Sequence, residues 1–386
     1  MTLHRIPAVY MRGGTSKALV FKEADLPESR EMRDAIFLAA MGVPDPHGRN
    51  LDGMGGGLSS LNKICIVGPP SRADADVDYT FVQLTPDITT VDYGGNCGNM
   101  SSAIGPFALE EGMVAPAQGA EASVRIHNTN TGKLILARFP VEDGQLAPDG
   151  DFVLDGVAGT AAPIKLEFLD PGGAKTGKLL PTGNAVDLLE RPGFDPIEAS
   201  LIDAANPCVF VRAANVGKTG AELPGELEAD AVWLVLMEAI RRAGSVAMGL
   251  AADLGAAARI ASIPKVAMVS APFPPYPSGE GLNHRLISGA FLQPEEFDIA
   301  IRMISVGQPH RAVPITGAVC LAVAARIPGS IPHEACRAQV GPIRIGHASG
   351  TTQVDAAIDA AGRAEYGAVF RTARRLFEGS VVYRAT

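Results

Sequence analysis

Cys97 lies in a glycine-rich turn, GGNCGN, that runs into a segment of small residues. We expect a helix to open at Asn99, so that free backbone N–H groups surround the thiol. Such a helix start attracts anions, and the same field stabilises a thiolate that can exchange a proton or act as a nucleophile. The residues alone leave open the alternative that Cys97 is a small buried cysteine in a packed turn.

Lys63 follows the glycine-rich run DGMGGG and leads directly into an apolar strand, Ile64–Val67. A lysine at the mouth of a buried strand is partly desolvated, which favours the neutral amine that can act as a base. The alternative is a surface lysine whose stem lies along apolar side chains. The glycines lack the spacing of a nucleotide-binding loop and no strand leads into them, so we expect no nucleotide there.

A third candidate is the turn RGGTS, Arg12–Ser16, between two expected strands, Ile6–Tyr10 and Lys17–Lys22. Two glycines followed by the hydroxyls of Thr15 and Ser16 can cradle an oxyanion or a carboxylate. A plain hairpin turn is the alternative interpretation.

The chain has 386 residues, which is long for one hydrophobic core, so we expect two domains, 1–185 and 186–386. Hydrophobic residues make up 47% and charged residues 19%, as in soluble globular proteins. The net charge of −9 argues against nucleic acid as a partner. The last strands are expected to cross back to the first.

Several classes of protein are not supported by the sequence. The N-terminus lacks a secretory signal, and no stretch reaches the roughly 18 apolar residues of a membrane helix. Five scattered cysteines do not resemble a disulfide framework, so a reducing cytoplasm fits best. No HxH, HExxH or CxxC spacing occurs, and we therefore expect no metal. Whether the chain forms a homodimer is open.

The expected elements recur in one order in both halves. The first half has a helix over Arg30–Met41 and further strands at Asp76–Gln83, Ser123–Asn128, Lys133–Val141 and Lys165–Leu169. The second half repeats an apolar strand (Pro207–Ala213), a lysine-led strand with Lys265 (Pro264–Ser270) and a small-residue helix with Cys320 (Thr316–Gly329). This order indicates an internal duplication in an α/β protein.

The motifs resemble those of the PrpF family almost from end to end. They are RGGTSK at 12–17, DGMGGGLSSLNK at 52–63, GNCGN at 95–99, GPFA at 105–108, PTGN at 181–184, MGL at 248–250, PKVAMVSAP at 264–272 and GHASGT at 346–351. The family includes 2-methylaconitate isomerases, aconitate and methylitaconate delta-isomerases and 4-oxalomesaconate tautomerases. The resemblance implies a diaminopimelate epimerase-like fold: two similar domains, each a curled mixed β-sheet around a central helix, with the active site between them.

The resemblance also implies roles for individual residues. Lys63 matches the general base of the family and Cys97 its active-site cysteine. The residues expected along the substrate carboxylates are Thr15, Ser16, Ser59, Ser60, Asn96, Gly98 and Asn99 in the first half, and Lys265, Ser349, Gly350 and Thr351 in the second. Epimerase relatives use two cysteines, so Cys320 is either a second active-site thiol or a packing residue.

These residues predict an isomerase that acts on an aconitate-like di- or tricarboxylic acid without a cofactor. Removal of an allylic proton gives a dienolate, which the N–H groups of a helix start stabilise, and the proton returns to either end of the allyl system. The alternatives are a 4-oxalomesaconate tautomerase, an epimerase that uses Cys97 and Cys320, and a carboxylate-binding protein without activity. The loop Phe273–Asn283 is expected to shape the substituent pocket and to act as a lid.

Overall fold

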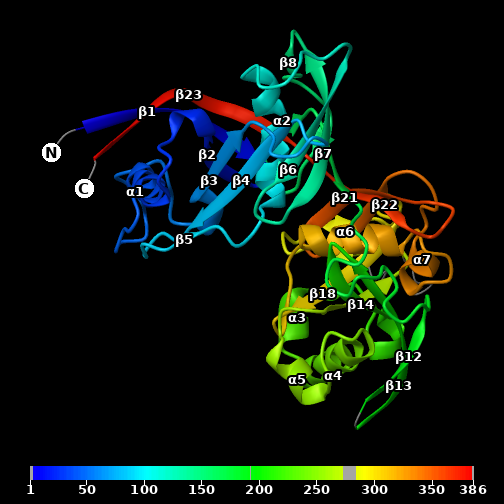
Figure 1. The fold of residues 1–386 in the computed structure, drawn as a ribbon. Helices are drawn as coiled ribbons and strands as arrows, with labels where there is room; N and C mark the ends of the chain where they lie inside the picture. Colours follow the sequence, from blue (N-terminus) through cyan, green and yellow to red (C-terminus); the bar gives the residue numbers. More distant parts are fainter. Residues whose placement is uncertain (1–2, 192, 273–283, 385–386) are drawn as a thin grey trace. The chain divides into compact units, whose positions relative to one another are not determined.

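The computed structural model describes residues 3–191, 193–272 and 284–384, which form two compact units (Figure 1). Unit 1 comprises Met1–Glu167 and Phe370–Thr386, and unit 2 comprises Phe168–Val369. The first boundary therefore falls after residue 167, where the sequence had suggested residue 185. The expected lid, 273–283, lies outside the described residues.

The sheet of unit 1 combines parallel and antiparallel pairs. Its main strands are β1 (Leu3–Gly13), β2 (Ser16–Lys22), β3 (Lys63–Gly68), β4 (Val77–Leu84), β6 (Glu121–Asn128), β7 (Lys133–Glu142) and β11 (Ile164–Leu169). From β1 to β7 the neighbours pair antiparallel, parallel, antiparallel, parallel and antiparallel. Short strands complete the unit: β5 (Val91–Asp92), β8 (Gln145–Leu146), β9 (Phe152–Val153) and β10 (Thr160–Ala161).

Unit 2 repeats this series of pairings. Its main strands are β12 (Asp187–Arg191), β13 (Phe194–Ala204), β14 (Asn206–Arg212), β15 (Lys265–Ser270), β18 (Ile299–Ser305), β20 (Ile343–His347), β21 (Gly350–Ile358) and β22 (Ala364–Arg371), with the short β16 (His284–Arg285), β17 (Phe291–Leu292) and β19 (Gln308–Pro309). From β13 to β21 the order is again antiparallel, parallel, antiparallel, parallel and antiparallel. The duplication and the mixed α/β class expected from the sequence are therefore present.

Each sheet packs around one apolar helix. In unit 1 this is α2 (Gly98–Glu110), which contacts β1, β2, β3, β6 and β7 and is buried from Met100 to Leu109 (Figure 1). In unit 2 it is α6 (Ile315–Ala324), which contacts β13, β14 and β21. Both helices are buried over most of their length and mostly apolar, as burial within a sheet requires. In the described part of the chain, no helix is long and apolar enough to cross a membrane.

The crossover helices also correspond between the units. In unit 1, α1 (Arg30–Met41) connects β2 to β3 with the bounds expected from the sequence: the Ser29 side chain accepts a hydrogen bond from Met32 N, and Gly42 ends the helix in the left-handed conformation. In unit 2, α4 (Ala231–Ala247) lies between β14 and β15. The other helices are α3 (Pro224–Glu228), α5 (Leu254–Arg259), α7 (Ile331–Ala335) and the 3-10 helices η1 (Glu23–Asp25), η2 (Ser59–Leu61), η3 (Ala213–Val216) and η4 (Pro294–Glu296).

The last strand of the chain belongs to unit 1. β23 (Ala373–Arg384) pairs antiparallel with β1, from Gly13 opposite Ala373 to Leu3 opposite Arg384. Figure 1 shows the two strands side by side at opposite ends of the colour scale. This pairing places residues 371 and 372 beside the turn that follows β1, where Gly14 N donates to Thr372 O at 2.9 Å.

Candidate active site

Cys97 is the residue immediately before α2, and its side chain is partly exposed. Its carbonyl accepts the first bond of the helix, from Ser101 N at 2.9 Å, so the helix begins one residue earlier than predicted. The N–H groups of the first turn have no partner within the helix and point toward the turn that holds the thiol. Together with the helix dipole they favour negative charge at this position. Ser101 Oγ donates to Asn96 Oδ1 at 3.4 Å and ties the turn to the helix.

The RGGTS turn is docked on this helix start. Asn99 Nδ2 donates to Thr15 Oγ1 at 3.1 Å. Gly14 has a φ of +53°, and a Cβ there would lie 2.3 Å from Asn99 Oδ1. Only glycine tolerates both the backbone conformation and the close approach. Thr15 is exposed beside the helix start, whereas Ser16 is buried at the start of β2.

Lys63 is the first residue of β3 and only 8% exposed, so the surface-lysine alternative is wrong. Its Nζ donates a hydrogen bond to Oε1 of Gln83, the residue opposite it on β4. The amide of Gln83 is fixed because its Nε2 donates to Ser59 O and Asn62 O, each at 3.0 Å. The ring of Phe81 lies 5.0 Å from Lys63 Nζ. Lys63 therefore has a defined position at the edge of the core.

Ser59 and Ser60 lie in η2, which ends two residues before Lys63. The glycine run before them folds tightly over the end of α1: a Cβ at Gly53 would lie 2.1 Å from Gly42 N. Asn62 Nδ2 also donates to Leu58 O at 3.0 Å, which fixes the approach to β3. The glycines thus serve close backbone packing.

Lys63 and Cys97 both act electrostatically on one buried thiol, that of Cys65 in β3. Burial raises the pKa of Cys65 strongly; Cys97 acts in the same direction and Lys63 opposes it. Cys65 Sγ lies 3.8 Å from the hydroxyl of Tyr79, whose pKa burial also raises well above its usual value. Cys65 and Tyr79 therefore stay neutral. Lys63 and Cys97, on different elements of unit 1, therefore both lie within electrostatic range of this thiol.

Unit 2 carries a partial counterpart. Lys265 is the first residue of β15, as Lys63 is of β3, and Lys265 Nζ donates to Ser305 Oγ at 2.7 Å. Burial lowers the pKa of Lys265, and burial together with Lys265 lowers that of His310. Ser349 Oγ donates to Arg311 O at 2.9 Å, and Gly350 and Thr351 begin β21. A binding role for Lys265 and for residues 349–351 stays a prediction.

Cys320 does not occupy the position of Cys97 in the repeat. The residue before α6 is Pro314, and Cys320 lies well inside the helix with no exposed surface. Burial raises the pKa of Cys320 well above its usual value, and the neighbouring Cys208 adds to this effect. Its Sγ faces Ile202 O at 3.5 Å. These contacts fit a packing residue and do not fit a second active-site thiol.

Two residues that the sequence does not single out, Arg371 and His310, interact with residues of the predicted site. Arg371 Nε donates to Asn99 Oδ1 at 3.2 Å, across 272 positions of the chain. No local pattern marks either residue, because Arg371 ends an ordinary strand and His310 follows a short one. The signal that would reveal Arg371 is the pairing of β23 with β1, which a single sequence does not show.

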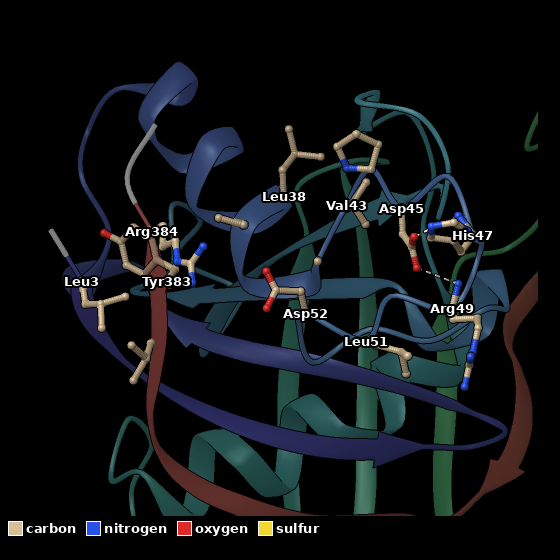
Figure 2. Close-up of a pocket in the computed structure, with 14 residues that line it drawn as sticks. Leu3, Leu38, Val43, Asp45, His47, Arg49, Leu51, Asp52, Tyr383 and Arg384 are labelled. Carbon is tan, nitrogen blue, oxygen red and sulfur yellow. Dashed lines mark hydrogen bonds between the residues drawn. The ribbon is translucent and has the colours of Figure 1, made fainter. Parts of the chain in front are cut away.

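The pocket in Figure 2 is a different feature of unit 1, with a volume of about 590 Å³. It lies between the loop after α1 and the ends of β1 and β23. Asp45 accepts hydrogen bonds from the backbone N–H groups of His47 and Arg49, each at 2.9 Å, and so fixes the loop. None of the residues that line it belongs to the predicted site.

Comparison with known proteins relates the whole chain to one family. The model of the PrpF protein family matches residues 3–384. The chain is 41% identical to a 3-methylitaconate isomerase from Eubacterium barkeri, covering 98% of this chain and 97% of the relative. It is 39% identical to a 2-methyl-aconitate isomerase from Shewanella oneidensis, covering 91% and 89%. The crystal structure of a methylitaconate-delta-isomerase superposes with a TM-score of 0.91 at 40% identity, covering 99% of this chain and 96% of that one.

Proposed function

The chain belongs to the PrpF family, and from that premise we propose that it is an isomerase of an unsaturated di- or tricarboxylic acid. The observation that carries the proposal is the placement of Lys63 and Cys97 in unit 1. One is held at the mouth of a buried strand, and the other stands at the start of the buried helix. Relatives over nearly the full length are named isomerases of methylitaconate and 2-methylaconitate.

The reaction begins with removal of a proton from the carbon next to a C=C–COO⁻ unit. The neutral amine of Lys63 takes this proton and becomes an ammonium, while the carbon's electrons delocalise into a dienolate. Return of a proton to the other end of the allyl system moves the double bond. Return to the original carbon after rotation exchanges cis and trans. Either Lys63 or the thiol of Cys97 delivers that proton.

The dienolate places negative charge on a carboxylate oxygen. The active site has to stabilise this charge while it develops. The first-turn N–H groups of α2 are held in place by the helix, so they need no reorganisation when charge develops. Thr15 adds a hydroxyl beside them, positioned by its bond to Asn99. The same groups bind the carboxylates of the ground state, which gives the site its preference for polyanionic acids.

The position of Cys320 counts against the two-cysteine epimerase. Such an enzyme needs a thiol on each side of the stereocentre, and both must reach the substrate. Cys320 is fully buried within unit 2, and the counterpart of Cys97 in the repeat is a proline. An isomerase that relies on Lys63 and Cys97 requires no second thiol.

Exchange of the allylic hydrogen in deuterated water tests the proposal. The purified protein is incubated with aconitate, 2-methylaconitate, methylitaconate and 4-oxalomesaconate, and label and products are followed by NMR and mass spectrometry. We expect deuterium at the allylic carbon of at least one acid, with an isomerised product, and loss of both in Lys63→Ala. Undiminished exchange in that variant would remove the proposed base. Stabilisation of the fold by these acids without turnover would favour a carboxylate-binding protein instead.

A further inference from the structure

We propose that Arg371 is the positioning residue of a carboxylate subsite at the start of α2, where it orients Asn99 and supplies positive charge. The inference rests on the proposed function, since it assigns this subsite to one carboxylate of the polyanionic substrate. Arg371 comes from the end of β22, in the segment that returns to unit 1 near the C-terminus.

Arg371 is buried, with 7% of its surface exposed, and its hydrogen bonds in the structure go to neutral acceptors. Its Nε donates to Asn99 Oδ1 at 3.2 Å and its Nη1 donates to Phe370 O at 2.8 Å. Among the described residues no carboxylate pairs with it. Burial lowers the pKa of Arg371 to about 10, so the group is still a cation at neutral pH. A buried cation without a counterion is costly, and such groups are usually kept for a function.

Within the described part of the chain, Arg12, at the end of β1, also has no counterion. Arg12 Nη1 donates to Gly14 O and to Thr372 O, each at 3.0 Å, and no carboxylate among the described residues contacts it. Arg375, in the adjoining strand, is different: it pairs with Glu110 at 2.7 Å and with Glu111 at 2.9 Å. Carboxylates are therefore available to a neighbouring arginine of the same segment, yet none pairs with Arg371 among the described residues.

Arg371 determines how Asn99 is presented. An amide side chain can be turned so that its oxygen and nitrogen exchange places. The guanidinium only donates hydrogen bonds, so it can pair with the amide oxygen and not with the amide nitrogen. Asn99 Nδ2 is thereby directed to Thr15 Oγ1, whose lone pair it occupies at 3.1 Å. The hydroxyl proton of Thr15 is then free to point to an anion. Three groups act in series, from Arg371 through Asn99 to Thr15, beside the N–H groups of the α2 start.

The test uses full-length variants and tricarballylate, a saturated tricarboxylate that cannot be isomerised. Calorimetry at 25 °C gives its Kd for the wild type, Arg371→Met, Arg371→Lys, Asn99→Ala and the double variant Arg371→Met with Asn99→Ala. The exposed Arg374→Gln is the matched control, because it removes one positive charge from the same segment. Values of kcat and KM for the best acid of the panel are measured alongside.

We expect Arg371→Met to weaken tricarballylate binding by about 10- to 100-fold, as loss of a charged hydrogen-bonding group does. Arg371→Lys should recover part of the loss, and Arg374→Gln should stay within about twofold of the wild type. The double variant should lose less affinity than the product of the two single losses, because the arginine acts in part through Asn99. If Arg371→Met does not fold, Asn99→Asp serves in its place, since its carboxylate neutralises Arg371 and should weaken binding similarly.

Wild-type affinity in Arg371→Met, or losses in the two single variants that multiply in the double variant, would overturn the subsite. These results differ from failure of the proposed function. A wild-type protein that binds tricarballylate but isomerises no acid would overturn the isomerase and leave the subsite standing. A wild-type isomerase whose KM is unchanged by Arg371→Met would overturn the subsite alone.

Discussion

Cys97 and Pro314 occupy the same position in the two repeats, each being the residue immediately before the central helix of its unit. The duplicated frame has kept the lysine at the start of the corresponding strand in both units. It has kept a thiol at the helix start in only one. Chemistry that needs a cysteine at this position therefore belongs to unit 1.

This asymmetry predicts opposite outcomes for two cysteine substitutions. Cys97→Ala should lower kcat by about 10²- to 10⁴-fold, the usual contribution of a proton-transferring group. Cys320→Ala removes one buried sulfur and should cost about 1 kcal/mol of stability while activity persists. Turnover and thermal unfolding of both variants check this. Equal loss of turnover in folded Cys320→Ala would restore the two-thiol mechanism.

A carboxylate in place of Gln83 should impair Lys63 as a base. Gln83→Glu places a carboxylate against Lys63 Nζ and favours the ammonium, which cannot accept a proton. We expect a rate reduced by about tenfold or more near neutral pH and an activity profile displaced to higher pH, measured as kcat/KM between pH 6 and 10. Gln145→Glu, an exposed change of the same kind in unit 1, is the control. An unshifted profile in Gln83→Glu would contradict Lys63 as the base.

Gly14 should tolerate no side chain. Gly14→Ala combines a positive φ with a Cβ 2.3 Å from Asn99 Oδ1, so it must displace either the turn or the helix start. Gly132 has a φ of +69° and an open environment, so Gly132→Ala carries only the backbone strain, about 1 kcal/mol. We expect KM to rise by about tenfold or more in Gly14→Ala and to stay unchanged in Gly132→Ala. The magnitude is that of losing one hydrogen bond to a charged substrate group. Equal KM values in the two variants would show that docking of the turn on Asn99 is unimportant for binding.

His284 should make unit 2 sensitive to acid. Burial lowers the pKa of His284 to about 3, and Arg302 and His347 add to this effect. Between pH 6.5 and 3 the unfolded chain binds a proton that the folded chain does not, so stability falls as pH falls, by about 1.4 kcal/mol per pH unit. Protonation would also displace the bond from Arg302 Nη2 to His284 Nε2, 2.8 Å long.

The measurement is urea unfolding between pH 4 and 7, followed by fluorescence of Trp233. This residue is the single tryptophan of the chain and is buried in unit 2. His284→Asn keeps a hydrogen-bond acceptor for Arg302. It should reduce the slope of the free energy of unfolding against pH by the contribution of one proton, about 1.4 kcal/mol per pH unit. His333→Asn in the same unit is the control. Parallel curves for wild type and His284→Asn would refute the assignment.

Local patterns were sufficient for much of the fold. The helix over Arg30–Met41 has its sequence-derived bounds because a serine cap, a left-handed glycine and a following proline all mark its ends. Lys63 and Cys97 were identified because each stands at a junction where residue types change abruptly. The repeat was visible because the lysine-led strand and the small-residue helix recur in one order.

Long-range contacts were not visible in the same way. Arg371 reaches Asn99 only because β23 returns to β1, and nothing near residue 371 records that pairing. The boundary of the units after residue 167 leaves no local signal, because the segment around it is itself a strand, β11, that runs across it. The sequence left the role of Cys320 open, because the local pattern around a reactive cysteine and around a buried packing cysteine is the same in a helix of small residues.

The pairing of β23 with β1 affects the order in which the protein matures during synthesis. Unit 2 is one continuous segment, so its core can close once residue 369 has left the ribosome. Unit 1 has to wait for residues 370–386, which bring both its missing edge strand and Arg371. A nascent chain that stops before β23 therefore carries Lys63 and Cys97 without this strand, and under the proposed subsite it binds anions only after Arg371 has reached Asn99.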